Sequence, residues 1–185
     1  MELTNKKGKI LTGLLIAGMI GFAVVARIAP HPANFAPIAA LGMMGGYLFA
    51  NRKLGLGIVM VGMLISDLII GIESMEMRLA VYGGLMLAVF AGGFLRGKDN
   101  KSFALGVPVA SLGSSIAFFV ISNLAVFAFS GMYAHNISGL ALCYINAIPF
   151  FWNTLAGDLL YSGILLGAVR MIQIYAMPEA VSARA

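Results

Sequence analysis

The stretch Leu54–Ile72, LGLGIVMVGMLISDLIIGI, decides the fold class, because it is long, apolar and continuous and contains one charged residue, Asp67. A bilayer's hydrocarbon core is about 30 Å thick and needs about 20 such residues in a helix. A strand of a membrane β-barrel would instead alternate apolar and polar residues. We therefore predict a transmembrane helix here. Asp67 is a candidate functional residue, since an ionisable group at membrane depth costs several kcal/mol unless it is paired or hydrated.

Five further apolar runs extend this prediction to an all-α membrane protein with six transmembrane helices. Hydrophobic residues make up 61% of the 185 residues and charged residues only 10%, whereas soluble domains contain about a quarter charged residues. No long polar stretch separates the runs, so we expect residues 1–185 to form a single integral membrane domain. The other predicted spans are Ile10–Ala29, Phe35–Ala50 (the shortest), Leu79–Leu95, Phe103–Phe129 and Thr154–Ile172.

The segment from Ile137 to Trp152 is apolar but interrupted by Asn146 and Pro149. At about 1.5 Å per residue it is too short to cross the bilayer comfortably. Proline also removes a hydrogen bond from the interior of a helix. We therefore predict an outer half-helix that folds back at Pro149 into the last span.

The basic residues predict the orientation of this bundle. Ten of the twelve lysines and arginines fall on one side of a six-span topology, and only Arg27 and Arg78 fall on the other. By the positive-inside rule both termini are cytoplasmic, and we expect the first run to be a permanent helix. The net charge of +5 is then explained by topology and by anionic lipid headgroups, so no nucleic-acid partner is expected. The ten residues are Lys6, Lys7, Lys9, Arg52, Lys53, Arg96, Lys98, Lys101, Arg170 and Arg184.

Two acids lie at similar predicted depths in this topology. Asp67 is five residues before the outer end of its span and Asp158 about five residues after the start of the last span, so both lie roughly 7–8 Å below the outer boundary. Arg27 can strongly neutralise only one of them, and Arg78 is expected in a loop. One acid would then be a structural ion-pair partner and the other would be free to meet a ligand. Which acid plays which part is left open.

Polar residues near this depth complete a candidate ligand site. The stretch Arg27–Pro37, RIAPHPANFAP, holds three prolines in eight residues, which predicts a stiff outer connection. It is either a rigid turn with a solvated histidine or a preformed rim over a cavity. Polar stripes at helical spacing follow the fifth and sixth spans, and such stripes face protein or water rather than lipid. The predicted ligand-binding residues are Arg27, His31, Asn34, Asp67, Asn123, Asn153, Asp158 and Tyr161.

Catalytic and metal sites are weaker interpretations of the same residues. Ser114 or Ser115 with His135 could suggest a serine hydrolase, but no nucleophile-elbow motif or phosphate-binding loop occurs, so we expect neither an enzyme nor a cofactor. The single cysteine excludes an internal disulfide and a cysteine-rich metal site. A metal pathway would rest on scattered residues, and none is predicted: His31, His135, Cys143, Met75 and Met77.

Small residues predict close helix contacts on the first two spans. Gly13, Ala17 and Gly21 recur every four residues, and Gly42, Gly45 and Gly46 crowd the second span. Such faces let helices approach closely. They serve either packing within the chain or docking to another membrane protein.

Three segments resemble a known family. The strings RIAPHPANFAPIAALGMMGG (27–46), SDLIIG (66–71) and AIPFFWNTLAGDLLY (147–161) look like those of DUF6580, bacterial small integral membrane proteins of unknown function. That family is in turn similar in size and six-helix layout to the substrate-binding S components of energy-coupling-factor (ECF) transporters. The resemblance implies an outward-facing cavity for a small molecule, such as a vitamin or a metal chelate. The alanine pair with which many S components meet their coupling subunit is here Ala17 and Gly21, with Gly13 before it.

We therefore expect an S-component-like binding or uptake protein of the bacterial inner membrane, partnered by a small-molecule ligand, the lipid bilayer and an ECF-type coupling module. The alternative is a structural or assembly subunit whose polar residues only hold the helices together.

Overall fold

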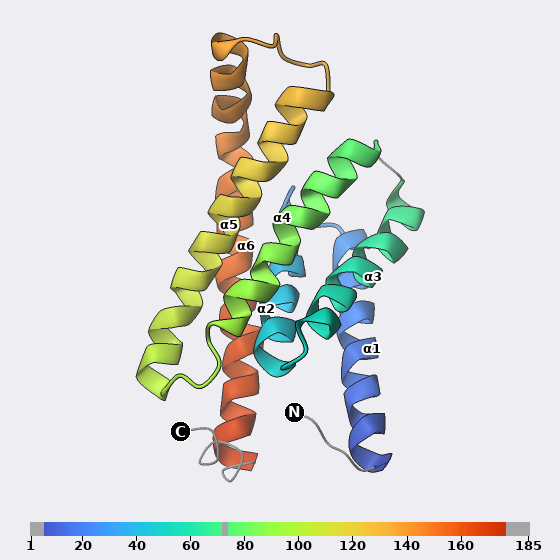
Figure 1. Ribbon diagram of the computed structural model, residues 1–185, viewed down its shortest axis with the longest axis vertical. Helices are drawn as coiled ribbons and strands as arrows, with labels where there is room; N and C mark the ends of the chain where they lie inside the picture. Colours follow the sequence, from blue (N-terminus) through green and yellow to red (C-terminus); the bar gives the residue numbers. More distant parts are fainter. Residues whose placement is uncertain (1–5, 72–73, 177–185) are drawn as a thin grey trace.

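The computed structural model describes residues 6–71 and 74–176, and within these ranges it is entirely helical. These residues form six helices. Figure 1 shows that they follow the long axis and that the chain reverses direction from each helix to the next. The beginning of the first helix and the end of the last lie at the same end of the bundle. Their bounds are α1 Lys6–Ile28, α2 Ile38–Leu48, α3 Arg52–Ile70, α4 Met75–Gly93, α5 Asn100–Phe129 and α6 Ile137–Ala176.

Five of these helices, α1, α3, α4, α5 and α6, are long and apolar enough to cross a membrane. The protein is therefore a helical, multi-pass membrane bundle. The predicted spans match the helices closely at α1, α3, α4 and α5. The end of the third predicted span, at Ile72, lies outside the described residues.

The one remaining helix, α2, is shorter than predicted. It has 11 residues, Ile38–Leu48, whereas the predicted span was Phe35–Ala50. At 1.5 Å per residue it is about 16 Å long, half the hydrocarbon thickness. Pro37 precedes its first turn, and Phe49 after it is extended. Arg96 donates hydrogen bonds to the carbonyl oxygens of Gly46 and Phe49. The last carbonyls of a helix have no amide partner within the helix, and Arg96 supplies this partner at the end of α2.

Every residue of α2 is buried, and this helix packs against all five others. Its glycines allow backbone to meet backbone, since a Cβ atom on Gly46 would lie 1.9 Å from the carbonyl oxygen of Val89 in α4. On the facing side, a Cβ atom on Gly92 would lie 1.9 Å from the carbonyl oxygen of Met43. The small residues of the second span therefore serve packing within the chain, one of the two roles considered for them.

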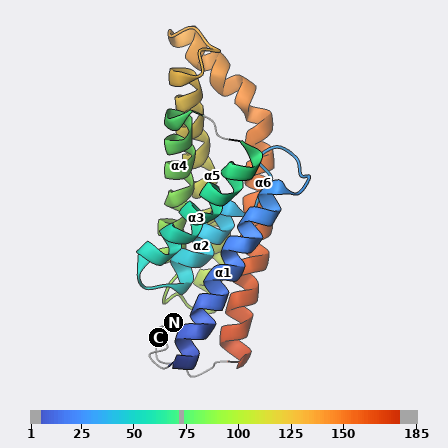
Figure 2. The ribbon, with the colours of Figure 1, turned by 90° about the vertical axis from the view of Figure 1, so that its right-hand side faces the viewer.

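The remaining helices lie in pairs around α2 and α4. α1 packs chiefly against α3, and α6 packs against α5 and α2. In Figure 2, α5 and α6 extend together well past the ends of the other helices. At 1.5 Å per residue the 40 residues of α6 span about 60 Å, twice the hydrocarbon thickness, so part of this pair extends beyond the hydrocarbon core or tilts strongly.

The predicted outer half-helix is wrong. Residues Ile137–Ala176 form one continuous helix that contains Pro149. Continuing through a proline loses one backbone hydrogen bond, whereas a break would leave the several unpaired backbone groups of two new helix ends. Pro108 lies inside α5 in the same way.

Candidate functional site

Asp67 and Arg27 form the predicted ion pair in what we call the arginine cluster. Nη1 of Arg27 lies 2.6 Å from Oδ1 of Asp67, and donates to the hydroxyl of Ser66 at 2.5 Å. The side chains of Arg27 and Asp67 are 22% and 14% exposed, so water screens this pair only in part. The prediction that Arg27 pairs with at least one acid is confirmed. The cluster consists of Arg27, Ser66, Asp67, Arg78 and Tyr82.

The second oxygen of Asp67 faces α4. The hydroxyl of Tyr82 donates to Oδ2 at 2.6 Å, and Nε of Arg78 lies 3.8 Å from the same oxygen. Arg78 was expected in a loop, but it lies in the first turn of α4, because Ser74 caps that helix by accepting a hydrogen bond from the amide of Met77. Asp67 therefore has both Arg27 and Arg78 as neighbours and links α1, α3 and α4.

Asp158 has an entirely different environment, which we call the hydroxyl cluster: Asp158 with Ser111, Ser115 and Ser162. The hydroxyl of Ser115 lies 2.7 Å from Oδ2 of Asp158, and the hydroxyl of Ser111 donates to the main-chain oxygen of Asp158 at 3.3 Å. The hydroxyls of Ser111 and Ser162 are hydrogen-bonded to each other. The three serines are fully buried and Asp158 is 3% exposed.

The two acids are therefore separate in their contacts. Asp158 has no lysine, arginine or histidine within 4.0 Å in the described part of the chain, and its Oδ1 accepts no hydrogen bond there. Its helix, α6, does not pack against α3, which carries Asp67. Asp158 also lies near the middle of α6, about 31 Å from the first residue of the helix. The helix that carries Asp158 begins at Ile137 and not at Thr154, the predicted start of the last span.

The proline-rich connection between α1 and α2 lies against α6 beside Asp158. The side-chain amide of Asn153 donates to the carbonyl of Ala33 at 3.1 Å, and the rings of Phe35 and Tyr161 have centroids 5.6 Å apart. Phe35 also packs on Gly157, where a Cβ atom would lie 3.4 Å from it. Figure 2 shows this blue connection beside α6. The predicted residues Asn153 and Tyr161 thus hold the connection against the helix that carries Asp158.

The other predicted site residues lie apart from both clusters. His31 is exposed, and its Nδ1 lies 2.8 Å from the carbonyl oxygen of Pro32. Asn34 is exposed and adopts a positive φ of 63°. Asn123 donates to the carbonyl of Phe119 in its own helix. Within the described residues no hydrogen bond joins Arg27, His31 and Asn34 to one another.

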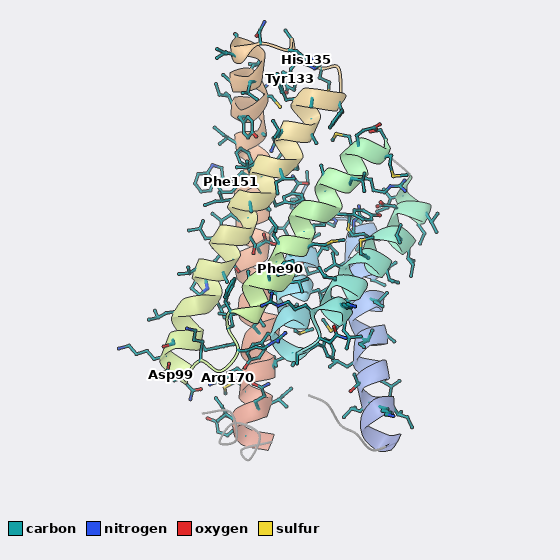
Figure 3. All side chains as sticks on the ribbon, viewed as in Figure 1. Phe90, Asp99, Tyr133, His135, Phe151 and Arg170 are labelled. Carbon is teal, nitrogen blue, oxygen red and sulfur yellow. The ribbon has the colours of Figure 1, made fainter. Side chains whose placement is uncertain are left out.

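The weaker catalytic and metal interpretations find no geometry in the described residues. His135 lies in the loop between α5 and α6 (Figure 3) and packs against Phe127, whereas Ser115 is hydrogen-bonded to Asp158. Cys143 is buried, and its thiol donates to the carbonyl of Asn123. Residues 6–71 and 74–176 contain no group of three histidine, cysteine, aspartate or glutamate side chains that could hold a metal ion.

Two features were missed, although the sequence contained a signal for each. Tyr82 follows Arg78 by four residues and therefore lies on the same face of α4, where both meet Asp67. Ser111, Ser115 and Ser162 were seen as polar stripes but were not included in the site. When each of two consecutive helices carries a stripe of polar residues, the two stripes are expected to face each other. In α5 and α6 they do, because Ser111 and Ser115 contact Asp158 and Ser162.

The small-residue face of α1 differs from that of α2. Gly13, Ala17 and Gly21 are exposed, and a Cβ atom on either glycine would have no heavy atom within 4 Å. This face therefore packs against nothing within the described chain.

Comparison with known proteins identifies a family without an assigned activity. None of the curated proteins and none of the solved structures matches the chain. A match over residues 8–180 is to the family described as "Family of unknown function (DUF6580)". Because this match covers nearly the whole sequence, the chain belongs to the DUF6580 family.

Proposed function

We propose that this membrane protein binds a small molecule inside the bundle beside Asp158 and takes it up from the outer side, in the manner of an ECF transporter S component. The proposal includes a bacterial inner membrane with both termini in the cytoplasm. No catalytic chemistry is part of it. The observation that carries the proposal is the burial of Asp158 without a cation.

A buried carboxylate needs partners that replace water. Ser115 supplies one hydrogen bond to Oδ2, and no described residue donates to Oδ1. A ligand with an ammonium, guanidinium or amide group would supply the missing donor. The chemistry of the site thus favours a cationic or hydrogen-bond-donating ligand over an anionic one.

Access to this site would depend on the connection between α1 and α2. This connection is held against α6 by one hydrogen bond, from Asn153 to Ala33, and by Phe35, which packs on Tyr161 and Gly157. These contacts are fewer than the buried backbone contacts of α2 with its neighbours, so the connection is easier to displace than α2. In this proposal the connection moves away from α6 to admit the ligand and then returns.

The second candidate is a structural or assembly subunit without a ligand. Two observations favour it. The hydroxyl of Ser115 also lies 3.0 Å from the carbonyl of Ser111, so a protonated Asp158 could donate to Ser115 while Ser115 donates to that carbonyl, and the cluster would need no ligand. The open face of Gly13, Ala17 and Gly21 suits a partner helix, which an assembly subunit and an S component docked to a coupling module would share.

The test is mass spectrometry of small molecules that remain bound to the protein after extraction into mild detergent. Wild-type protein and Asp158→Asn are compared with Ser122→Ala, a matched control that removes a half-buried hydroxyl bonded only to its own helix. A charged hydrogen bond contributes about 1.5–3 kcal/mol, so we expect Asp158→Asn to retain at least about tenfold less of the compound. Equal retention by Asp158→Asn, or a wild-type protein with no bound compound, would leave the assembly subunit as the better account.

A further inference from the structure

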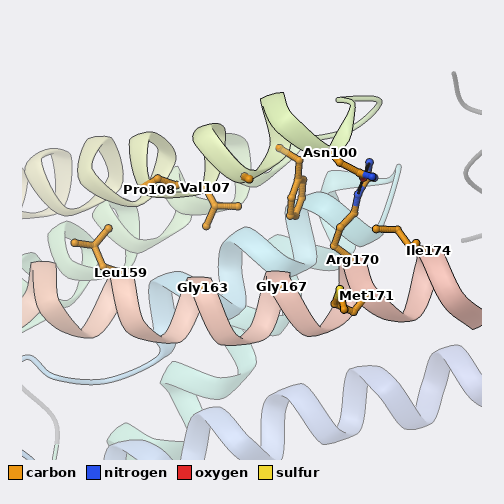
Figure 4. Close-up of a pocket in the computed structure, with 11 residues that line it drawn as sticks. Asn100, Val107, Pro108, Leu159, Gly163, Gly167, Arg170, Met171 and Ile174 are labelled. Carbon is orange, nitrogen blue, oxygen red and sulfur yellow. Dashed lines mark hydrogen bonds between the residues drawn. The ribbon is translucent and has the colours of Figure 1, made fainter.

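An apolar groove runs between α5 and α6 in the part of the pair nearer the chain termini. Figure 4 shows it from the side, with Arg170 and Asn100 at one end and Leu159 and Pro108 at the other. Its volume is about 520 Å³. Gly163 and Gly167 form part of its floor, and a Cβ atom on either would have no heavy atom within 4 Å. The groove exists because these two positions lack side chains.

The part of the groove between Leu159 and Arg170 has the length of one leaflet of a bilayer, and the lining continues past Arg170 to Met171 and Ile174. Leu159 and Arg170 are eleven residues apart on α6, which is about 16 Å at 1.5 Å per residue. Half of the hydrocarbon core is about 15 Å. With Arg170 at the level of the headgroups, the apolar part of the groove would run inward to about the middle of the membrane.

The polar end of the groove carries Arg170, a cation whose charge no described residue neutralises. Arg170 donates to Oδ1 of Asn100 at 2.7 Å, to the carbonyl of Lys98 at 3.0 Å and to the hydroxyl of Tyr47 at 3.2 Å. Its guanidinium also lies 5.2 Å from the centre of the Phe103 ring. All of these partners are uncharged. Among the described residues no carboxylate lies within 4.0 Å of Arg170.

Nearby charges leave this end positive. Lys98 and Lys101 are exposed beside it. Asp99 caps α5, and hydrogen bonds from Ser102 lower the pKa of its carboxyl, so it carries one negative charge at neutral pH. Together with Arg170, the four groups have a net charge of about plus two. Basic residues at this level attract anionic lipid headgroups.

We propose that this groove binds an anionic phospholipid, with one acyl chain between α5 and α6 and the headgroup phosphate at Arg170. The charge at one end and the apolar lining over one leaflet's depth both match this occupant. A second copy of the chain could approach the same face through Gly163 and Gly167. An apolar helix on this face would leave Arg170 without an anion.

The experiment fills the groove and, separately, changes its cation. The protein is reconstituted in bilayer nanodiscs of equal parts phosphatidylglycerol and phosphatidylcholine, released into detergent and examined by native mass spectrometry. Gly163→Leu combined with Gly167→Leu fills the groove. The matched control is Gly113→Leu, which also places leucine in open space on a helix but outside the groove. We expect the groove-filled protein to lose one bound phosphatidylglycerol and the control to keep it.

Arg170→Gln tests the headgroup, with Arg170→Lys as the variant that restores the charge. One basic residue near a membrane surface contributes about 1 kcal/mol of attraction to anionic lipid, so glutamine should reduce the preference for phosphatidylglycerol about fivefold and lysine should restore it. Unchanged lipid retention in the groove-filled protein would overturn the proposal. A change from dimer to monomer in that protein, with lipid retention unaffected, would assign the groove to a second copy instead.

Discussion

Replacement of Asp67 by asparagine should destabilise the protein much more than the same change at Asp158. Asp67 accepts hydrogen bonds at 2.6 Å from both Arg27 and Tyr82, with Arg78 at 3.8 Å. The amide keeps the shape of the side chain but leaves two arginines without their shared anion. Removing one partner of a buried ion pair costs about 3–5 kcal/mol.

Partial exposure places the expected loss at the lower end of that range. The Asp67 side chain is 14% exposed and that of Arg27 22%, so water screens the stranded charges to some degree, and we expect a loss of about 3 kcal/mol. For a chain of 150–250 residues, each kcal/mol lowers Tm by about 2–4 °C, which gives a decrease of about 6–12 °C. Asp158→Asn leaves no cation unpaired, and Ser115 can donate to the amide oxygen. Its expected loss is that of one hydrogen bond, about 1 kcal/mol or 2–4 °C.

The assay is thermal unfolding in detergent micelles, followed by the helical circular dichroism signal. Ser66→Ala is the control within the arginine cluster, because it removes the hydroxyl that accepts from Arg27 and leaves both charges of the ion pair in place. It should lower Tm by only a few degrees. A decrease for Asp158→Asn as large as that for Asp67→Asn would refute the assignment of Asp67 as the structural acid.

Two further predictions concern packing and topology. Gly46→Ala should prevent the close approach of α2 to α4, because its Cβ atom would lie 1.9 Å from the Val89 carbonyl oxygen. We expect a loss of at least about 1–3 kcal/mol in thermal melts, whereas Gly113→Ala, which meets no neighbour, should be neutral or stabilising. Reporter enzymes fused after Ala185 and within Gly97–Lys101 should be active in the cytoplasm and one at Tyr133–Asn136 outside it, because ten of the twelve basic residues favour that orientation. An external carboxyl terminus would contradict the positive-inside assignment.

Hydropathy alone predicts most of the helices, because an apolar run of about 20 residues has few alternatives in a membrane. Hydropathy does not correctly predict where α6 and α2 begin and end. Pro149 and Asn146 interrupt the last apolar run, but the loss of one backbone hydrogen bond at the proline does not end the helix, and α6 continues through both residues. The length of α2 could not be predicted from its apolarity, since the proline-rich connection before it and Arg96 after it determine where that helix begins and ends.

The pairing of Arg27 with one of the two acids could be predicted from charge and depth, but neither the choice of Asp67 nor the separation of the two acids could. Depth along the membrane normal says nothing about which helices are neighbours. That information depends on the position of α2, whose burial on all sides requires the exact fit of its glycines to α3 and α4. Such a fit is a property of tertiary packing rather than of any single apolar run.

The central position of α2 bears on how the two clusters relate to function. Met43 of α2 lies 4.0 Å from the hydroxyls of Ser111 and Ser114, so α2 borders the hydroxyl cluster. Its glycines hold α3 and α4, the helices that present Asp67, Arg78 and Tyr82 to one another. A movement of α2 would therefore disturb backbone contacts on both sides. A movement of the proline-rich connection before it would disturb fewer contacts on α6: one hydrogen bond, one aromatic pair and the packing of Phe35 on Gly157. In our proposal the connection is accordingly the part that moves to admit a ligand, and α2 with the arginine cluster is the fixed frame against which Asp158 is held.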